Sequence, residues 1–116
     1  MLVDTIELEG NPYPICFPTA AFAEFERQTD STAVDLLAQF ETGMVNFTHL
    51  CVLVAAGLNS GARKTSTGKK FTAEDAGDMF GLMDIPKITP ILKKYLVAET
   101  DTETEKNDQG ATIPEA

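Results

Sequence analysis

The chain has 116 residues, which is enough for one domain that buries about two-thirds of the surface of its unfolded chain. A hydrophobic content of 43% without tryptophan is typical of a soluble globule and excludes a chain that is disordered throughout or embedded in a membrane. The formal net charge of −9 disfavours a nucleic-acid partner, because binding to a phosphate backbone depends on Lys and Arg.

The first residues do not form a secretory signal, because no basic region precedes an apolar stretch. We therefore expect a protein that is made and kept in the cytosol. Cys16 and Cys51 are the only cysteines, too few for a disulfide framework, and a reducing compartment would leave both as thiols.

An N-terminal β-hairpin is predicted from alternating apolar residues. The alternation runs through residues 6–9 and resumes from Tyr13 to Phe17, with turn chemistry at Gly10-Asn11 between the two runs. Pro12 and Pro14 cannot donate to a sheet ladder, so we expect the second strand to be an edge or only partly paired. Such a hairpin is marginal alone and must pack on the helices that follow.

Two short helices are predicted next. The first covers residues 20–28, with Thr19 as its N-cap. The second covers residues 32–40 and carries an apolar stripe. The stripe consists of Val34, Leu37 and Phe40.

The central helix of the predicted fold covers residues 46–58. Its apolar residues recur at helical spacing from Phe47 to Leu58, and further apolar residues spread around most of its circumference, so it must lie inside the domain. It is too short for a membrane span, which needs about 20 apolar residues. Asn46 and Thr48 both remain open as its cap, and Gly57 with the residues 59–61 predicts its end.

A polar loop with four basic residues and no acid is predicted over residues 60–70. The pattern from Thr72 to Asp75 then predicts a capping box, and apolar residues continue at helical spacing to Met83. The last helix begins either at Pro86, with Pro90 as a kink, or at Pro90 itself, and the sequence leaves both open.

Residues 99–116 lack an apolar period and carry six acidic residues against one lysine, a net charge of −5. A segment of this composition cannot bury enough apolar surface to order itself. The sequence thus predicts a single α+β domain over residues 1–98, with the hairpin packed on about five helices, followed by a disordered acidic tail over residues 99–116.

No catalytic, cofactor or metal site is predicted. The run from Gly61 to Lys70 departs from a phosphate-binding loop in its spacing, and it follows a helix instead of a strand. His49 and Cys51 are two residues apart on a helix and point in different directions. Cys16 with His49 is the one nucleophile–base pairing left open.

Partner binding is the remaining candidate activity, since soft apolar side chains that stay exposed can bind helices or extended segments of other proteins. A basic loop can in turn contact an acidic partner. The candidate residues are Phe22, Phe25, Phe40, Met44, Met79, Phe80 and Met83, together with Lys64, Lys69 and Lys70 of the loop. The competing interpretation places all the apolar candidates in the core.

The order of these patterns resembles the small tail assembly chaperones of long-tailed bacteriophages and phage-derived gene transfer agents. The resemblance covers residues 5–97. It lies in the strand pair of residues 6–17, the segment Ala20 to Arg27, Leu36-Leu37, the stretch Leu50 to Leu58 ending in Val-Ala-Ala-Gly-Leu, and the helix start Phe71-Thr-Ala-Glu-Asp75.

The resemblance implies a non-enzymatic protein of the bacterial host cytoplasm that holds the long tape measure protein soluble. It also implies recruitment of tail tube subunits, absence from the mature virion, and in many relatives a longer frameshifted form. A homo-oligomer is left open. The alternatives are a small cytosolic protein–protein adaptor or regulator of unrelated role, a thiol enzyme, and a nucleic-acid module using Arg63 and the loop lysines.

Overall fold

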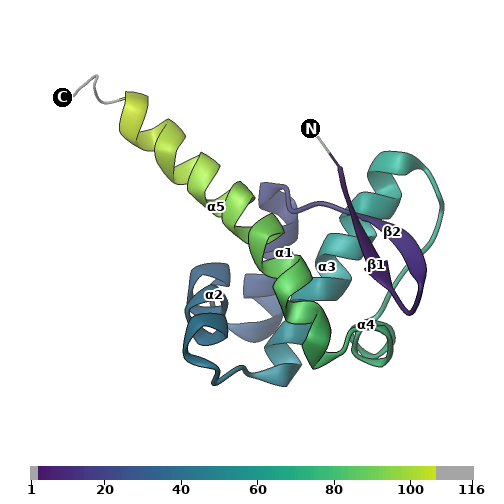
Figure 1. The fold of residues 1–116 in the computed structure, drawn as a ribbon. Helices are drawn as coiled ribbons and strands as arrows, with labels where there is room; N and C mark the ends of the chain where they lie inside the picture. The colour runs from purple at the N-terminus through teal and green to yellow at the C-terminus, as the bar shows by residue number, and fades with distance from the viewer. Residues whose placement is uncertain (1–2, 107–116) are drawn as a thin grey trace.

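The computed structural model describes residues 3–106, and the side chains of residues 3–96. Within these residues a two-stranded antiparallel hairpin is followed by five α-helices, as predicted for an α+β domain (Figure 1). The elements are β1 (Asp4–Leu8), β2 (Asn11–Ile15), α1 (Thr19–Thr29), α2 (Ala33–Thr42), α3 (Phe47–Thr65), α4 (Ala73–Met79), the 3-10 helix η1 (Leu82–Asp84) and α5 (Ile85–Lys106).

The predicted hairpin is present, and in its register Ile6 faces Tyr13 across the two strands. Its tight turn is Glu9-Gly10, and not the predicted Gly10-Asn11. Both turn residues have positive φ, 54° and 81°, as a two-residue turn with the twist of the strands requires. Ile6, Leu8 and Ile15 of the hairpin are buried in the core, and Tyr13 is partly buried against it.

α3 is the central helix, as predicted, but it extends seven residues further than the predicted end at Leu58. Gly57 and Gly61 lie inside α3, at the place where β2 and the residues that follow it cross the helix at very short range. A Cβ on Gly61 would lie 2.2 Å from the Pro14 carbonyl oxygen, and the Cys16 N–H donates to the Gly57 carbonyl at 3.2 Å. These glycines therefore allow close packing and do not terminate the helix. Of the two possible caps, Asn46 accepts from the His49 N–H at 3.1 Å.

The two predicted short helices are present with shifted details. α1 begins at Thr19 itself with Pro18 in the N-cap position, so the prediction of Thr19 as N-cap was wrong. In α2 the buried residues are Ala33 and Leu36, whereas Val34 is 63% exposed. The predicted stripe is therefore wrong at Val34, whereas Phe40 packs half-buried against the core, because the packing of α2 on α5, α1 and α3 decides which side of the helix is covered.

In the second half of the fold, the predicted helix cap is present, but the lengths of the helices differ from the predicted ones. Thr72 and Asp75 form the predicted capping box at the start of α4, but the helix ends at Met79 and does not continue to Met83. α5 begins at Ile85 and contains Pro90, so the alternative of one long helix is correct. α5 continues past residue 98 to Lys106, and residues 107–116 of the predicted tail lie outside the described residues.

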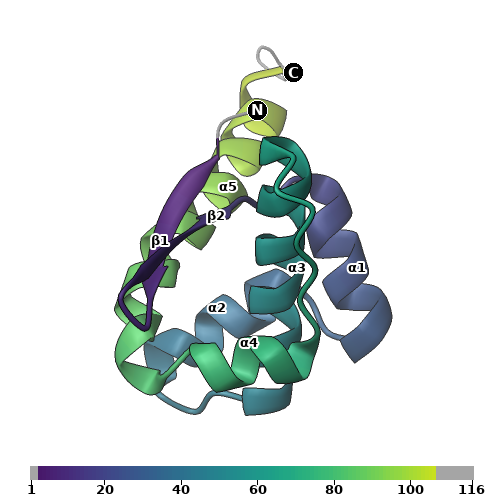
Figure 2. The same ribbon diagram turned by 90° about the vertical axis from the view of Figure 1, so that its right-hand side faces the viewer.

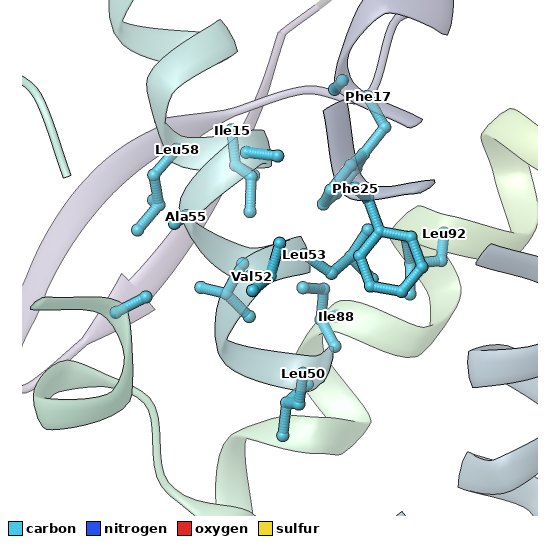
Figure 3. Packing of buried hydrophobic residues seen from close by; sticks show 14 of the residues in the cluster. Ile15, Phe17, Phe25, Leu50, Val52, Leu53, Ala55, Leu58, Ile88 and Leu92 are labelled. Carbon is cyan, nitrogen blue, oxygen red and sulfur yellow. The ribbon is translucent and has the colours of Figure 1, made fainter. Parts of the chain in front are cut away.

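The core lies where the hairpin, α1 and α5 meet around α3 (Figures 2 and 3). Its largest fully buried side chains come from all of these elements, so the core depends on contacts between segments far apart in the sequence. They include Ile15, Phe17, Phe25, Leu53, Ile88 and Leu92. Within residues 3–106, no helix combines the length and the apolarity that crossing a membrane requires.

Candidate protein-binding surfaces

A small apolar pocket opens between the first half of α3 and the residues that end α4. Its volume is about 190 Å³, and Phe47 and Leu82 stand at its rim, 57% and 63% exposed. Leu50, Val54 and Phe80 are buried and form its floor. A cavity of about 150 Å³ can hold a benzene ring, so this pocket has room for one large apolar side chain.

Close packing of α4 on α3 shapes this pocket. Gly77 of α4 faces Cys51 of α3, where a Cβ would lie 2.9 Å from the Cys51 Sγ. Burial raises the pKa of the Cys51 thiol, and the carboxylate of Asp78 raises it further. The thiol is therefore neutral at physiological pH and acts as an apolar part of the pocket wall.

The structure divides the predicted apolar candidates into three groups. Phe22, Phe25 and Phe80 are buried, and of these three only Phe80 lines the apolar pocket, as part of its floor. Phe40 and Met79 are half-buried against the core. Met44 and Met83 are 80% and 84% exposed, and only these two present most of their side chains to solvent.

Sequence reasoning missed the two residues at the rim of the pocket. Phe47 belongs to the apolar stripe of α3 and was therefore expected in the core, but it lies in the first turn, beyond the neighbouring elements that would cover it. Leu82 lies in η1, where the predicted helical spacing does not apply. Two predicted candidates lie close to these rim residues in the sequence. Met44 stands three residues before Phe47, and Met83 directly follows Leu82, so these methionines were the nearest indication of the pocket that the sequence offered.

A second surface is a broad groove between α1, the second half of α3 and the connection to α4. Figure 2 shows this connection running back along α3. Its volume of about 1380 Å³ exceeds the range of about 300–1,000 Å³ usual for small-molecule sites, so a polypeptide segment fits it better. Small residues make up much of its lining, among them Ala20, Ala23, Ala55 and Ala56. Four basic residues and a single acid line it as well: Arg27, Arg63, Lys69, Lys70 and Glu24.

We call this surface the basic groove. The side chain of Asn59 in α3 forms two hydrogen bonds with the connection that borders it. The Asn59 side-chain amide donates to the Phe71 carbonyl at 2.8 Å and accepts from the Phe71 N–H at 2.7 Å. Lys69 lies over the Tyr13 ring, with its Nζ 5.7 Å from the centroid. The sequence predicted Asn59 as part of the end of the central helix. In the structure, Asn59 instead lies within α3 and holds the connection through Phe71, twelve residues further along the chain.

The three predicted lysines do not share one surface. Lys69 and Lys70 line the basic groove, but Lys64 does not, although it is exposed on the same helix as Arg63. The arginines that complete the groove are held by local contacts. Arg63 donates to the Ser60 hydroxyl at 3.0 Å, and Arg27 pairs with Glu24.

The Cys16–His49 pair is not assembled. Cys16 is fully buried next to Gly57, which lies eight residues, about 12 Å of helix, beyond His49. Burial raises the pKa of the Cys16 thiol more than the charges of Lys64 and Arg63 lower it, which is the reverse of thiol activation. Among the described residues, the Nδ1 of His49 is buried without a hydrogen-bond partner.

Within the part of the chain that the structure describes, no group of three His, Cys, Asp or Glu side chains could hold a metal ion. Comparison of the chain with family models, curated proteins and solved structures found no match.

Proposed function

We propose that this chain is a non-enzymatic tail assembly chaperone, as the sequence resemblance implies, and that the apolar pocket binds a helical segment of the tape measure protein. The observation that carries this proposal is the pocket itself, with Phe47 and Leu82 more than half exposed at its rim. Exposed apolar side chains around a pocket are typical of surfaces that take an apolar anchor from another protein.

The size of the surface suits reversible binding. Burying one Leu or Phe side chain contributes about 1.5–3 kcal/mol, whereas association costs about 4–15 kcal/mol in lost freedom of motion. One anchor in the pocket is therefore not sufficient, and the exposed Met44 and Met83 would have to contribute. A few such contacts hold an apolar helix and still release it when the tail tube assembles.

The wider role follows the resemblance. The protein would act in the cytoplasm of the bacterial host, recruit tail tube subunits to the bound tape measure protein, and be left out of the mature virion. A small cytosolic adaptor or regulator would use the same pocket for another partner, so the partner's identity separates the two functions.

Coexpression with the tape measure protein encoded in the same genome tests the proposal. We expect the tape measure protein to become soluble and to copurify with this chain. Leu82→Ser should reduce the copurified amount at least about fivefold, since a lost apolar contact of about 1 kcal/mol or more changes binding by that factor.

Val34→Ser is the matched control, because Val34 is also 63% exposed but does not line the pocket. We expect this variant to bind like the unchanged chain. A tape measure protein that stays insoluble would contradict the chaperone function, whereas equal losses in the two variants would contradict the pocket as its binding site.

A further inference from the structure

The basic groove has a charge opposite to that of the whole molecule. It collects four of the nine basic residues of a chain whose net charge is −9. Glu24, the single acid that lines it, is paired with Arg27. Arg63, Lys69 and Lys70 are thus left as an excess of positive charge along the groove, and we expect its occupant to be acidic.

The chain itself contains a segment of that chemistry. Residues 99–106, which we call the acidic end, carry four acids and one lysine. They form the last part of α5, and Figure 1 shows this end of the helix projecting beyond the other elements. α5 packs on α2, β1 and η1, and it contributes no residue to the basic groove.

We propose that the acidic end of one copy docks in the basic groove of a second copy. The same copy is excluded, because α5 is one helix from Ile85 to Lys106 and cannot fold its last turns back onto α1 and α3. The following ten residues carry only Asp108 and Glu115, too little charge to match the groove.

The spacing of the acids fits a helix in this groove. Glu99 and Glu103 are four residues apart in the sequence, as are Asp101 and Glu105, and four residues of helix span about 6 Å along its axis. The alanines that line the groove allow a helix backbone to approach closely. A pair of acids can then lie near Arg63 or the two loop lysines.

The contact joins two different surfaces of the chain. Two copies that exchange their acidic ends reciprocally close a two-fold dimer, whereas a one-way contact makes rings or open chains. In each case we expect the average mass to rise above that of the monomer as the concentration increases. This self-association goes beyond the proposed function, since neither Phe47 nor Leu82 takes part in it.

Sedimentation of the full chain tests this inference. At about 0.01 M salt, where charges interact over about 30 Å, we expect the weight-average mass to rise above 12.6 kDa as the protein concentration increases. At about 1 M salt, where this distance is about 3 Å, we expect the monomer alone. The variant Lys69→Glu/Lys70→Glu should weaken association at least about tenfold, since like charges then face each other.

A charge exchange makes the test specific. Glu103→Lys/Glu105→Lys should also weaken association, and mixing this variant with Lys69→Glu/Lys70→Glu should restore it, because opposite charges meet again. Lys64→Glu/Lys93→Glu is the matched control, since it makes the same change of charge outside the groove and should associate like the unchanged chain. A monomer at low salt, an association that both reversals leave intact, or a mixture that stays monomeric would overturn the inference.

Discussion

Gly61 shows how a single residue determines the distance between α3 and β2. A Cβ at this position would lie 2.2 Å from the Pro14 carbonyl oxygen and 2.4 Å from its carbonyl carbon. Both atoms belong to the backbone, so a rotamer change cannot relieve the clash. We expect Gly61→Ala to lower the free energy of unfolding by about 1–3 kcal/mol, despite the higher helix propensity of alanine. Denaturant titration measures this loss.

Gly81→Ala is the control for this prediction. The nearest atom to a Cβ on Gly81 is the Asp84 Oδ2 at 3.8 Å, an ordinary contact, and the N–H that Asp84 accepts is retained. We expect a change of less than about 0.5 kcal/mol, as for most substitutions away from special contacts. Equal stability of the two variants would mean that β2 can move away from α3 without loss.

Tyr95 has a phenol that stays neutral far into the alkaline range. Burial raises its pKa to about 12, with further contributions from the charge of Asp4 and from the hydrogen bond that the phenol donates to its carboxylate at 3.2 Å. The unfolded phenol ionises near pH 10, so the stabilisation is fully present below about pH 10 and is lost as the pH rises through about 12.

Absorbance titration of Tyr13→Phe, in which Tyr95 is the remaining tyrosine, measures this pKa directly. We expect ionisation near pH 12, and a lower midpoint when Asp4→Asn is added, because the neighbouring negative charge is removed. A midpoint near pH 10 in the folded protein would contradict the contact between the hairpin and α5.

At the scale of elements, Asp84 joins three parts of the fold. Its carboxylate accepts from the Gly81 N–H at 2.9 Å at the start of η1 and pairs with Lys87 of α5 at 3.0 Å. Lys87 in turn donates to the Glu7 carbonyl of β1 at 2.9 Å. Desolvation acts to raise the pKa of Asp84, but these hydrogen bonds and the Lys87 charge outweigh it and lower the pKa below its usual value.

The sign of this shift predicts a dependence of stability on pH. Because the folded pKa of Asp84 is lowered, its contribution is present above about pH 4 and is lost as the pH falls through the folded pKa. We expect Asp84→Asn to lower the free energy of unfolding by about 1–3 kcal/mol at pH 7 and by less in acid. Denaturation at both pH values tests this, with the exposed Asp30→Asn as control. A difference independent of pH would contradict the role of the carboxylate.

At the scale of the whole molecule, long-range contacts set the arrangement of the hairpin and the helices. The hairpin is held against α5 by Asp4, which accepts from Lys94 at 2.6 Å and from Tyr95. It is held against α3 by the two glycines of that helix. Both contacts join residues far apart in the sequence, so local patterns could not predict them.

The candidate surfaces could be predicted only in part for the same reason. Met44 and Met83 are exposed, as a binding surface needs, and Lys69 and Lys70 line the basic groove. Phe25 is fully buried, whereas Phe47, which also belongs to an apolar face predicted for its helix, is 57% exposed. Helical spacing marks an apolar face, but it does not indicate which turns of that face the neighbouring elements cover.

The sequence by itself determined the hairpin, the five helices, the central position of α3 and the cap at Thr72, because each depends on alternation, helical spacing or a hydrogen bond within a few residues. Only the tertiary structure decided the full length of α3, the buried face of α2, the pocket between α3 and α4, and the basic groove. These features depend on which segments approach one another, and packing between distant residues, and not local propensity, determines that approach.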